Sequence, residues 1–209
     1  MAGMSNNIVF LTRTYKPNSN IGLIKYCLRG IFHDSGYSYR HVIIVDTARY
    51  HNDKDWMEYK DQNTSVILHD KMEKDTQNTL GIDYALETLP INDNDYVYIL
   101  DDDNIIHPRF IYLLNRYVKG EDVIVFQCEE RPELAKPQIM AQSTVGRIDW
   151  CNFLTKARLM RELKVYDPAG TRCEDGLFFN KLKYSGCNIK FIEDEFAFYN
   201  KLKNNAFYA

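Results

Sequence analysis

The stretch that decides the fold of this chain reads Asp95-Tyr96-Val97-Tyr98-Ile99-Leu100-Asp101-Asp102-Asp103-Asn104. Its apolar and aromatic residues, 96–100, predict a short buried strand. The strand ends directly in three carboxylates, which are therefore held together at one edge of a sheet. Carboxylates that close repel one another, and in a partly dry cleft each raises the pKa of the next. A divalent cation removes that cost, so the sequence predicts a metal site at the carboxyl end of this strand.

The order of the other elements predicts the architecture. Buried strands are expected at 8–11, 42–45, 65–69, 122–128 and 188–192, and helices at 21–32, 76–89, after Pro108, near 156–163 and from 173. This near-regular alternation implies an α/β fold with a mostly parallel central sheet between helices on both faces. The segment 131–142 contains two prolines and is expected to be a loop or a short hairpin.

Length, charge and cysteine content limit the class of protein. The 209 residues suffice for one sizeable domain, with a nucleotide-binding half at about 1–104 and a second half at about 105–209. A net charge of -3 argues against a non-specific nucleic-acid binder. The apolar run 8–11 is too short for a signal peptide or a membrane span. The five cysteines are scattered without a C-x-x-C pair, which fits a reducing, cytoplasmic compartment.

Polar residues follow the first two predicted strands. Thr12-Arg13-Thr14 come after the first strand, and Asp46 ends the second. A strand, a helix and a second strand ending in an acid form a nucleotide-binding half-fold, in which the acid takes ribose or base groups. Because no G-x-G-x-x-G follows the first strand, the dinucleotide-binding version is disfavoured.

Four stretches, in this order between residues 8 and 195, resemble the GT-A class of nucleotide-sugar glycosyltransferases. They are Thr12-Arg13-Thr14 with Asp46, Asn78-Thr79-Leu80-Gly81-Ile82, the D-x-D motif Asp101-Asp102-Asp103, and Gly146-Arg147-Ile148-Asp149-Trp150 followed by Glu174-Asp175-Gly176. Within this class the chain is similar to the small glycosyltransferase domain of chlorella viruses that decorates the major capsid protein. That similarity implies a single GT-A domain, 1–209, excised from a longer polypeptide and working in the cytoplasm of the host cell.

The resemblance implies a metal-dependent transfer of a hexose-type sugar from a UDP-sugar donor to a glycan or glycoprotein acceptor. The donor nucleotide would be bound by Thr12, Arg13, Thr14, Asp46, Asn78, Asp101 and Asp102. Asp103, with Asp101 directly or through water, would hold Mn²⁺ or Mg²⁺. Many family members add a late histidine, but none follows His107 here, so the diphosphate, water or the tail would complete the shell.

The resemblance also assigns the acceptor side. Asp149 and Trp150 would contact the acceptor, and Asp175 is the expected general base. Its neighbour Glu174 would orient the acceptor or take the base role instead. A Glu–Asp motif with a candidate base favours inversion of the anomeric centre, although retaining enzymes share the fold and the D-x-D motif.

Structural explanations and two other functions stay open. Acids at a helix N-terminus are favoured by the helix dipole whatever the function, and Trp150 suits a core as well as an acceptor platform. A phosphohydrolase of the haloacid-dehalogenase kind, which is Mg²⁺-dependent, also places D-x-D after a strand and would use Asp101 as its nucleophile. The position where that family has Thr or Val is Ile105 here. A nucleotide-sugar-binding module without turnover is the third possibility.

Overall fold

The computed structural model describes residues 7–14, 19–47, 54–69, 79–129, 131–167, 173–199 and 202. The strands are β1 (Asn7–Thr14), β2 (Ser38–Asp46), β3 (Thr64–His69), β4 (Tyr96–Ile99), β5 (Ile105–Ile106), β6 (Val123–Cys128), β7 (Phe153–Lys156) and β8 (Ile189–Phe198). The α-helices are α1 (Ser19–Phe32), α2 (Lys54–Met57), α3 (Thr79–Thr88), α4 (Phe110–Tyr117), α5 (Ala157–Leu163) and α6 (Glu174–Tyr184). Two 3₁₀ helices, η1 (Pro137–Ala141) and η2 (Trp150–Asn152), complete the described elements.

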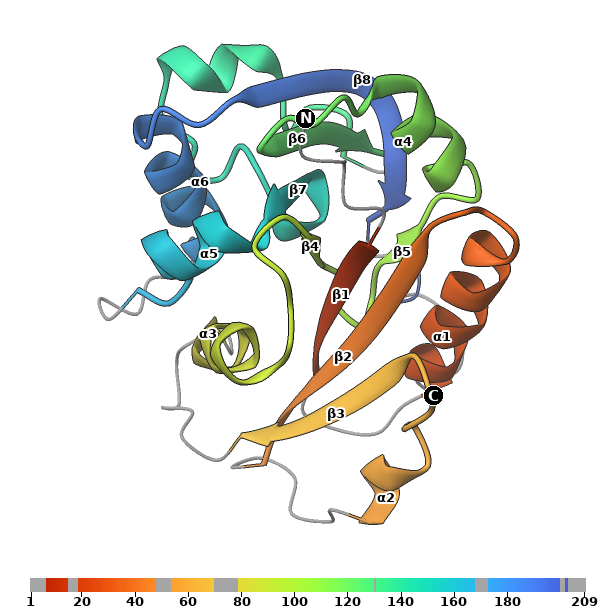
Figure 1. Ribbon diagram of the computed structural model, residues 1–209. Coiled ribbons are helices and arrows are strands. Elements are labelled where there is room, and N and C mark those ends of the chain that lie inside the picture. Colours follow the sequence, from red (N-terminus) through yellow and green to blue (C-terminus); the bar gives the residue numbers. More distant parts are fainter. Residues whose placement is uncertain are drawn as a thin grey trace.

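These strands form one sheet in the order β3-β2-β1-β4-β7-β6-β8-β5 (Figure 1). The four strands from β3 to β4 are parallel, whereas β7 runs antiparallel to both of its neighbours. β6 and β8 are again parallel, and β5 pairs antiparallel with β8 at the far edge. The predicted mostly parallel α/β sheet is therefore confirmed. Because β1 to β4 run the same way, their carboxyl ends meet at one edge, where open α/β sheets bind ligands.

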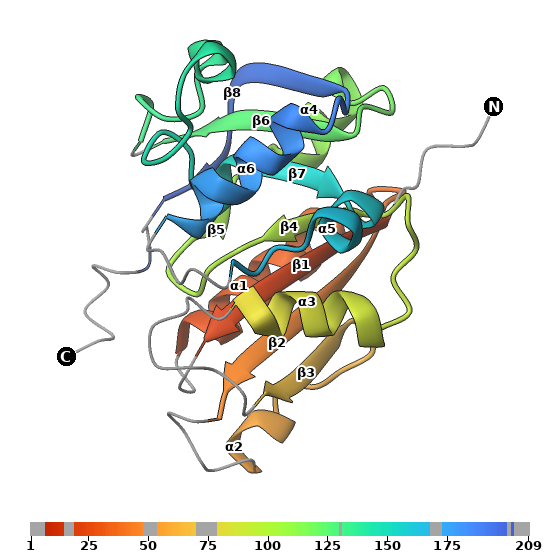
Figure 2. The ribbon, with the colours of Figure 1, turned by 90° about the vertical axis from the view of Figure 1, so that its left-hand side faces the viewer.

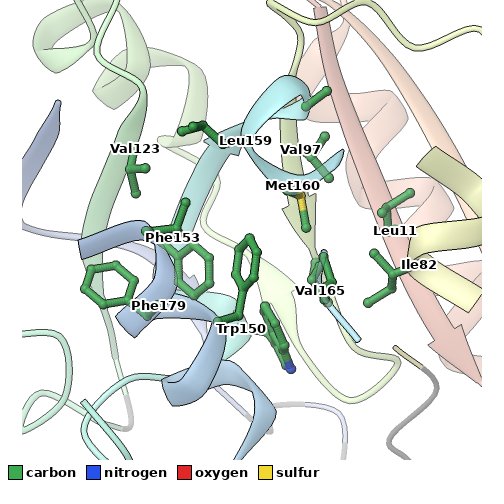
Figure 3. Packing of buried hydrophobic residues seen from close by; sticks show 14 of the residues in the cluster. Leu11, Ile82, Val97, Val123, Trp150, Phe153, Leu159, Met160, Val165 and Phe179 are labelled. Atoms are coloured by element: carbon green, nitrogen blue, oxygen red, sulfur yellow. The ribbon is translucent and has the colours of Figure 1, made fainter. Parts of the chain in front are cut away.

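Helices cover both faces of the sheet, which gives the predicted three layers (Figure 2). Helices α3, α5 and α6 pack on one face against Val9, Leu11 and Val97, among other residues (Figure 3). Helices α1 and α4 pack on the other face, against the alternate residues Phe10 and Tyr98. Successive side chains of a strand point to opposite faces, so β1 and β4 are buried on both. Their runs of consecutive apolar residues follow from this two-sided burial.

The segment 131–142 is a loop that contains η1, with Pro137 in its first turn, so the first of the two expected alternatives holds and the hairpin does not. The carboxyl-terminal half departs from the expectations at β5, which was not expected, and at β8. β8 was expected to end at residue 192 but continues to Phe198, with register shifts against β6. The extension is held by side chains: Phe196 is fully buried and stacks on Phe126 with ring centroids 4.4 Å apart. Within the described residues, no helix is both long and apolar enough to cross a bilayer.

Candidate functional site

The three acids lie at the carboxyl edge of the sheet, and the strand alternation continues into them. Val97 and Ile99 face the α3, α5 and α6 layer, while Tyr98 and Leu100 face the α1 and α4 layer. The contacts of Asp101 and Asp102 follow this alternation, because Asp101 pairs with Arg13 and Asp102 with Thr14, the next residue of β1. All three carboxylates are half-buried, which leaves them accessible to a ligand at this edge.

Asp101 is bound by Arg13 of the neighbouring strand. The Nε of Arg13 donates to Asp101 Oδ1 at 2.7 Å and its Nη2 donates to Oδ2 at 2.6 Å. Their side chains are 10% and 26% exposed, so this bidentate pair is largely removed from water. Burial lowers the pKa of Arg13, but Asp101 outweighs it and the pKa is raised, with further contributions from Asp149 and Glu174. The guanidinium therefore lies within the field of several site carboxylates.

Asp102 and Asp103 are held by other parts of the chain. Thr14 Oγ1 donates to Asp102 Oδ2 at 2.8 Å, on the α1 side of the sheet. Asn20 Nδ2, from the first turn of α1, donates to the Asp102 carbonyl at 2.9 Å. The backbone N–H of Leu202 donates to the Asp103 carbonyl at 3.0 Å. These hydrogen bonds hold the backbone of the segment Asp101–Asp103, the acid loop, in place without a ligand.

Asp149, which the sequence resemblance assigns to acceptor binding, lies at the entry to η2. It is the N-cap of η2, with Oδ1 accepting from Cys151 N at 3.2 Å, and Asn152 Oδ1 accepts from the Asp149 backbone N–H at 2.9 Å. Burial and then Asp101 raise the pKa of Asp149, whereas the Cys151 hydrogen bonds and Arg13 lower it. Asp149 therefore interacts electrostatically with both members of the ion pair.

Asp175 and Glu174 begin α6. Glu174 is 1% exposed, whereas Asp175 is half-buried, so Asp175 is the one that a substrate can reach. Burial raises the pKa of Asp175 to about 6; Asp149 and Asp101 add to the increase, and Gly176 N–H and Arg13 oppose it. Asp175 Oδ1 accepts from Gly176 N at 2.7 Å. A carboxylate with a pKa near 6 is suited to general base catalysis close to neutral pH.

The segment before Asp149 is packed tightly against the start of α6. Thr144, which is fully buried, donates from Oγ1 to the carbonyl of Gly176 at 2.5 Å. A Cβ added at Gly176 would lie 2.7 Å from Val145 Cα and 2.9 Å from the Thr144 carbonyl oxygen. Only glycine allows this approach, which brings the segment at Thr144 and Val145 to the residue after Asp175.

The substitution Gly176→Ala is expected to lower the free energy of unfolding by about 1–3 kcal/mol, because backbone atoms must move to admit the methyl group. Urea unfolding midpoints measure the change. Gly30→Ala is the matched control, since no heavy atom lies within 4 Å of a Cβ added there in α1. It is expected to gain about 0.5–1 kcal/mol from the better helix propensity of alanine. Equal midpoints for the two variants would contradict the close approach.

Other predicted site residues are placed as follows. Thr12 faces the α1 layer, is fully buried and bonds to His41 Nε2 at 2.9 Å, so its side chain is not at the surface of the edge. Asp46 is 8% exposed at the end of β2. Trp150 is 2% exposed and packs among Phe153 and Phe178, as a core residue does. Asn78 lies outside the described residues.

The hydrogen bonds from Asn20 and Leu202 were not anticipated from the sequence. The Asn20 amide reaches the Asp102 carbonyl from the first turn of α1, 82 positions earlier in the sequence. Leu202 is 4% exposed and belongs to the core on the α1 side, while its backbone N–H contacts Asp103. An apolar residue in a basic tail gives no local signal of such a contact, because its partner is far away in the sequence.

The oxygen donors at this edge suit Mn²⁺ or Mg²⁺, which prefer carboxylates, phosphates and water. In the part of the chain that the structure describes, no group of three or more His, Cys, Asp or Glu side chains is arranged to hold a metal ion. Asp103 and Asp101 can supply two carboxylates, so a bound metal would need ligands from the substrate as well. Asp101 can take part only through the lone pairs that Arg13 leaves open.

Known structures share this fold. Staphylococcus aureus TarS 1–349 has a TM-score of 0.68 and 14% identity, with 92% of this chain and 60% of that chain covered. TarS in complex with UDP gives a TM-score of 0.65. The mannosyltransferase PcManGT from Pyrobaculum calidifontis, in complex with GDP-Man and Mn²⁺, gives 0.66 at 12% identity, over 95% of this chain and 58% of that one. The chain thus spans about 60% of the length of these two structures.

A further similar structure belongs to a different kind of enzyme. The 4-diphosphocytidyl-2C-methyl-D-erythritol synthase from Anaerococcus prevotii has a TM-score of 0.58 at 9% identity, with 95% of this chain and 90% of that chain covered. No protein-family model and no curated protein sequence matches the chain. At these identities the likeness establishes the fold alone, which is that of the GT-A nucleotide-sugar transferases.

Proposed function

We propose that this protein is a metal-dependent glycosyltransferase that moves a hexose-type sugar from a UDP-sugar to a glycan acceptor with inversion. One observation carries the proposal: Asp175, half-buried and with its pKa raised to about 6, lies in the field of Asp101 at the ligand-binding edge of a GT-A fold. Sugar transfer needs a base that removes the acceptor proton and a group that stabilises the charge of the departing diphosphate. Asp175 would supply the first, and the acid loop with its metal the second.

The bond between the sugar C1 and the diphosphate oxygen breaks as the acceptor oxygen bonds to C1. The transition state is oxocarbenium-like, and the acceptor hydroxyl must lose its proton. Asp175 takes that proton, so its carboxylate form is the active one. Asp103, with Asp101, would hold the metal, which stabilises the negative charge on the departing diphosphate. Thr14 and Asn20 orient Asp102, which we assign to the donor ribose or sugar.

The competing functions fit the geometry less well. In a phosphohydrolase Asp101 would have to act as the nucleophile, but both of its oxygens accept hydrogen bonds from Arg13. A binding module has no need for a general base beside its ligand, and UDP release from a UDP-sugar would distinguish it from an enzyme. A nucleotidyltransferase shares the fold, so binding of nucleoside triphosphates in preference to UDP would favour that alternative.

The proposal extends to the biological process and the compartment in which the reaction takes place. We assign the protein to glycan synthesis on a viral capsid glycoprotein, in the cytoplasm of the host, on the sequence resemblance described above. All five cysteines are free thiols, which supports a reducing compartment. The acceptor would bind beside Asp149. Buried Trp150 would pack under Asp149, and the two residues together would form the wall of the acceptor site.

A thermal-shift panel of UDP, GDP and CDP, each with and without Mn²⁺, tests the function. A ligand at about 100 times its Kd adds about 2.7 kcal/mol to stability. For a chain of this size that raises Tm by roughly 5–10 °C. We expect this shift with UDP plus Mn²⁺, and a much smaller one with UDP or Mn²⁺ alone. The absence of a shift with every nucleotide would sink the proposal, and a preference for GDP or CDP would overturn its donor.

A further inference from the structure

The guanidinium of Arg13 lies between the acid loop and the segment of Asp149 and Trp150. Arg13 is on β1 and faces the α6 side, like Val9 and Leu11 before it. In the sheet β1 is followed by β4 and then β7, so Arg13 reaches over the end of β4 toward the start of β7. Its Cζ lies 5.9 Å from the centroid of the Trp150 ring, directly after Asp149. The side chain thus connects the acid loop to the acceptor-side wall.

Four carboxylates interact electrostatically with this one guanidinium. Asp101 is bound directly, while Asp149 and Glu174 act on the charge of Arg13 from further away. Arg13 in turn acts on the charge of Asp175. Without a cation, acids this close in a partly dry site repel one another and favour their protonated forms. Arg13 therefore opposes the increase in the pKa of Asp149 and of Asp175 that burial and the neighbouring carboxylates cause.

The pair geometry is difficult to reconcile with the direct donor contact expected from the sequence. Arg13 is 10% exposed at its side chain, and its Nε and Nη2 both donate to Asp101. The N–H groups that Asp101 does not use belong to a side chain that is only 10% exposed, so a donor phosphate has little access to them unless it displaces Asp101 from this bidentate pair. Breaking such a pair leaves a buried charge uncompensated, which costs several kcal/mol.

We infer that Arg13 is a positioning residue that locks Asp101 of the acid loop to the wall formed by Asp149 and Trp150, which packs against α6 through Phe178, three residues after Asp175. The inference rests on the proposed function, in which Asp175 is the base. It replaces the donor-binding role that the sequence resemblance assigns to Arg13. The charge and the planar shape of the guanidinium contribute separately. A lysine would keep the positive charge, but only the guanidinium binds both oxygens of Asp101 at once.

The variants Arg13→Gln and Arg13→Lys separate charge from shape. The readout is a carbon NMR titration of the Asp175 carboxyl group, identified by its loss in Asp175→Asn. The charged groups that act on Asp175 are Asp149, Asp101 and Arg13. Because Arg13 lowers its pKa, we expect Arg13→Gln to move the midpoint upward from about 6, and Arg13→Lys to move it less. Arg13→Gln is also expected to lower kcat for UDP release from UDP-glucose.

A donor contact predicts a different pattern in a second measurement, the affinity for UDP with Mn²⁺ by calorimetry. Loss of a charge-assisted hydrogen bond to a phosphate lowers affinity about tenfold or more. A positioning residue leaves this affinity within about threefold, since the lost bond is not to the ligand. A tenfold loss with an unmoved Asp175 midpoint would overturn the inference. So would an unmoved midpoint alone.

Arg158→Gln is the matched control. Arg158 pairs with Asp122, another partly buried Arg–Asp pair, at the opposite edge of the sheet. This variant should change neither the Asp175 midpoint nor UDP affinity, so an effect shared with it would mark general destabilisation. If Arg13→Gln does not fold, Arg13→Lys carries the same test. Failure of the unchanged protein to bind UDP and Mn²⁺ would sink the proposed function instead, and the titration would still report on Arg13.

Discussion

Replacing Asp175 with asparagine is expected to lower kcat by about 10²–10⁴-fold while the protein stays folded. Asparagine has nearly the same shape and can still accept from Gly176 N, but it cannot take a proton. For the unchanged protein we expect kcat/KM to fall as the pH drops through about 6, where Asp175 becomes protonated. Rates of UDP release across pH 4–9 measure both effects. Full activity of the variant would exclude Asp175 as the base.

The same substitution is expected to stabilise the protein above pH 6. Burial raises the pKa of Asp175 in the folded state from 3.8 to about 6, so ionising it there costs free energy. The stability that the protonated group contributes is complete below pH 3.8 and is lost as the pH rises through about 6. Asp175→Asn should therefore exceed the unchanged protein in Tm at pH 7–8 and match it near pH 3.5. Catalytic groups commonly show this exchange of stability for function.

Asp34→Asn serves as the control for the loss of a carboxylate. Its side chain is 88% exposed and contacts only the exposed His33 among the charged pairs of the described residues. Asp34 has a φ of 54°, a conformation that asparagine also tolerates. We expect activity, the pH profile and Tm to be unchanged, which would tie the effects above to Asp175.

Asp103→Asn is the second substitution with a large expected effect. If Asp103 holds the metal, its loss removes charge stabilisation from the departing diphosphate and lowers kcat by about 10²–10³-fold or more. It should also remove the part of the UDP thermal shift that depends on Mn²⁺. The Leu202 contact is with the backbone of Asp103, so this hydrogen bond is kept. Removing the metal from the unchanged protein with EDTA should reproduce the variant.

The Mn²⁺ dependence of UDP binding distinguishes this role from a structural one. A merely structural Asp103 would lower Tm in the absence of ligand but leave the Mn²⁺-dependent shift intact. Equal shifts in Asp103→Asn and Asp34→Asn would therefore remove Asp103 from the metal site. The outcome also bears on Asp101, which Arg13 already binds through both oxygens and which we expect to contribute less to metal affinity.

The sequence was sufficient for the elements whose patterns are local. Consecutive apolar residues at 8–11 and 42–45 predict strands buried on both faces, and the structure has them fully or almost fully buried. The position of the acids at the end of β4 follows from the same pattern. The extension of β8 to Phe198 was missed because it depends on stacking against Phe126, a partner seventy positions earlier.

The sequence by itself determined which residue types stand at the ends of which strands, because the twofold alternation of a strand and the spacing of a helix are written in neighbouring positions. Only the tertiary structure decided which of those residues meet. Arg13 and Asp101 are 88 positions apart, and they pair because Leu11 is in register with Ile99 and each of the two residues follows two positions later in its chain segment. Register comes from packing over the whole sheet, so Arg13 became a partner of Asp101 while Thr12, one residue earlier, was buried beneath α1.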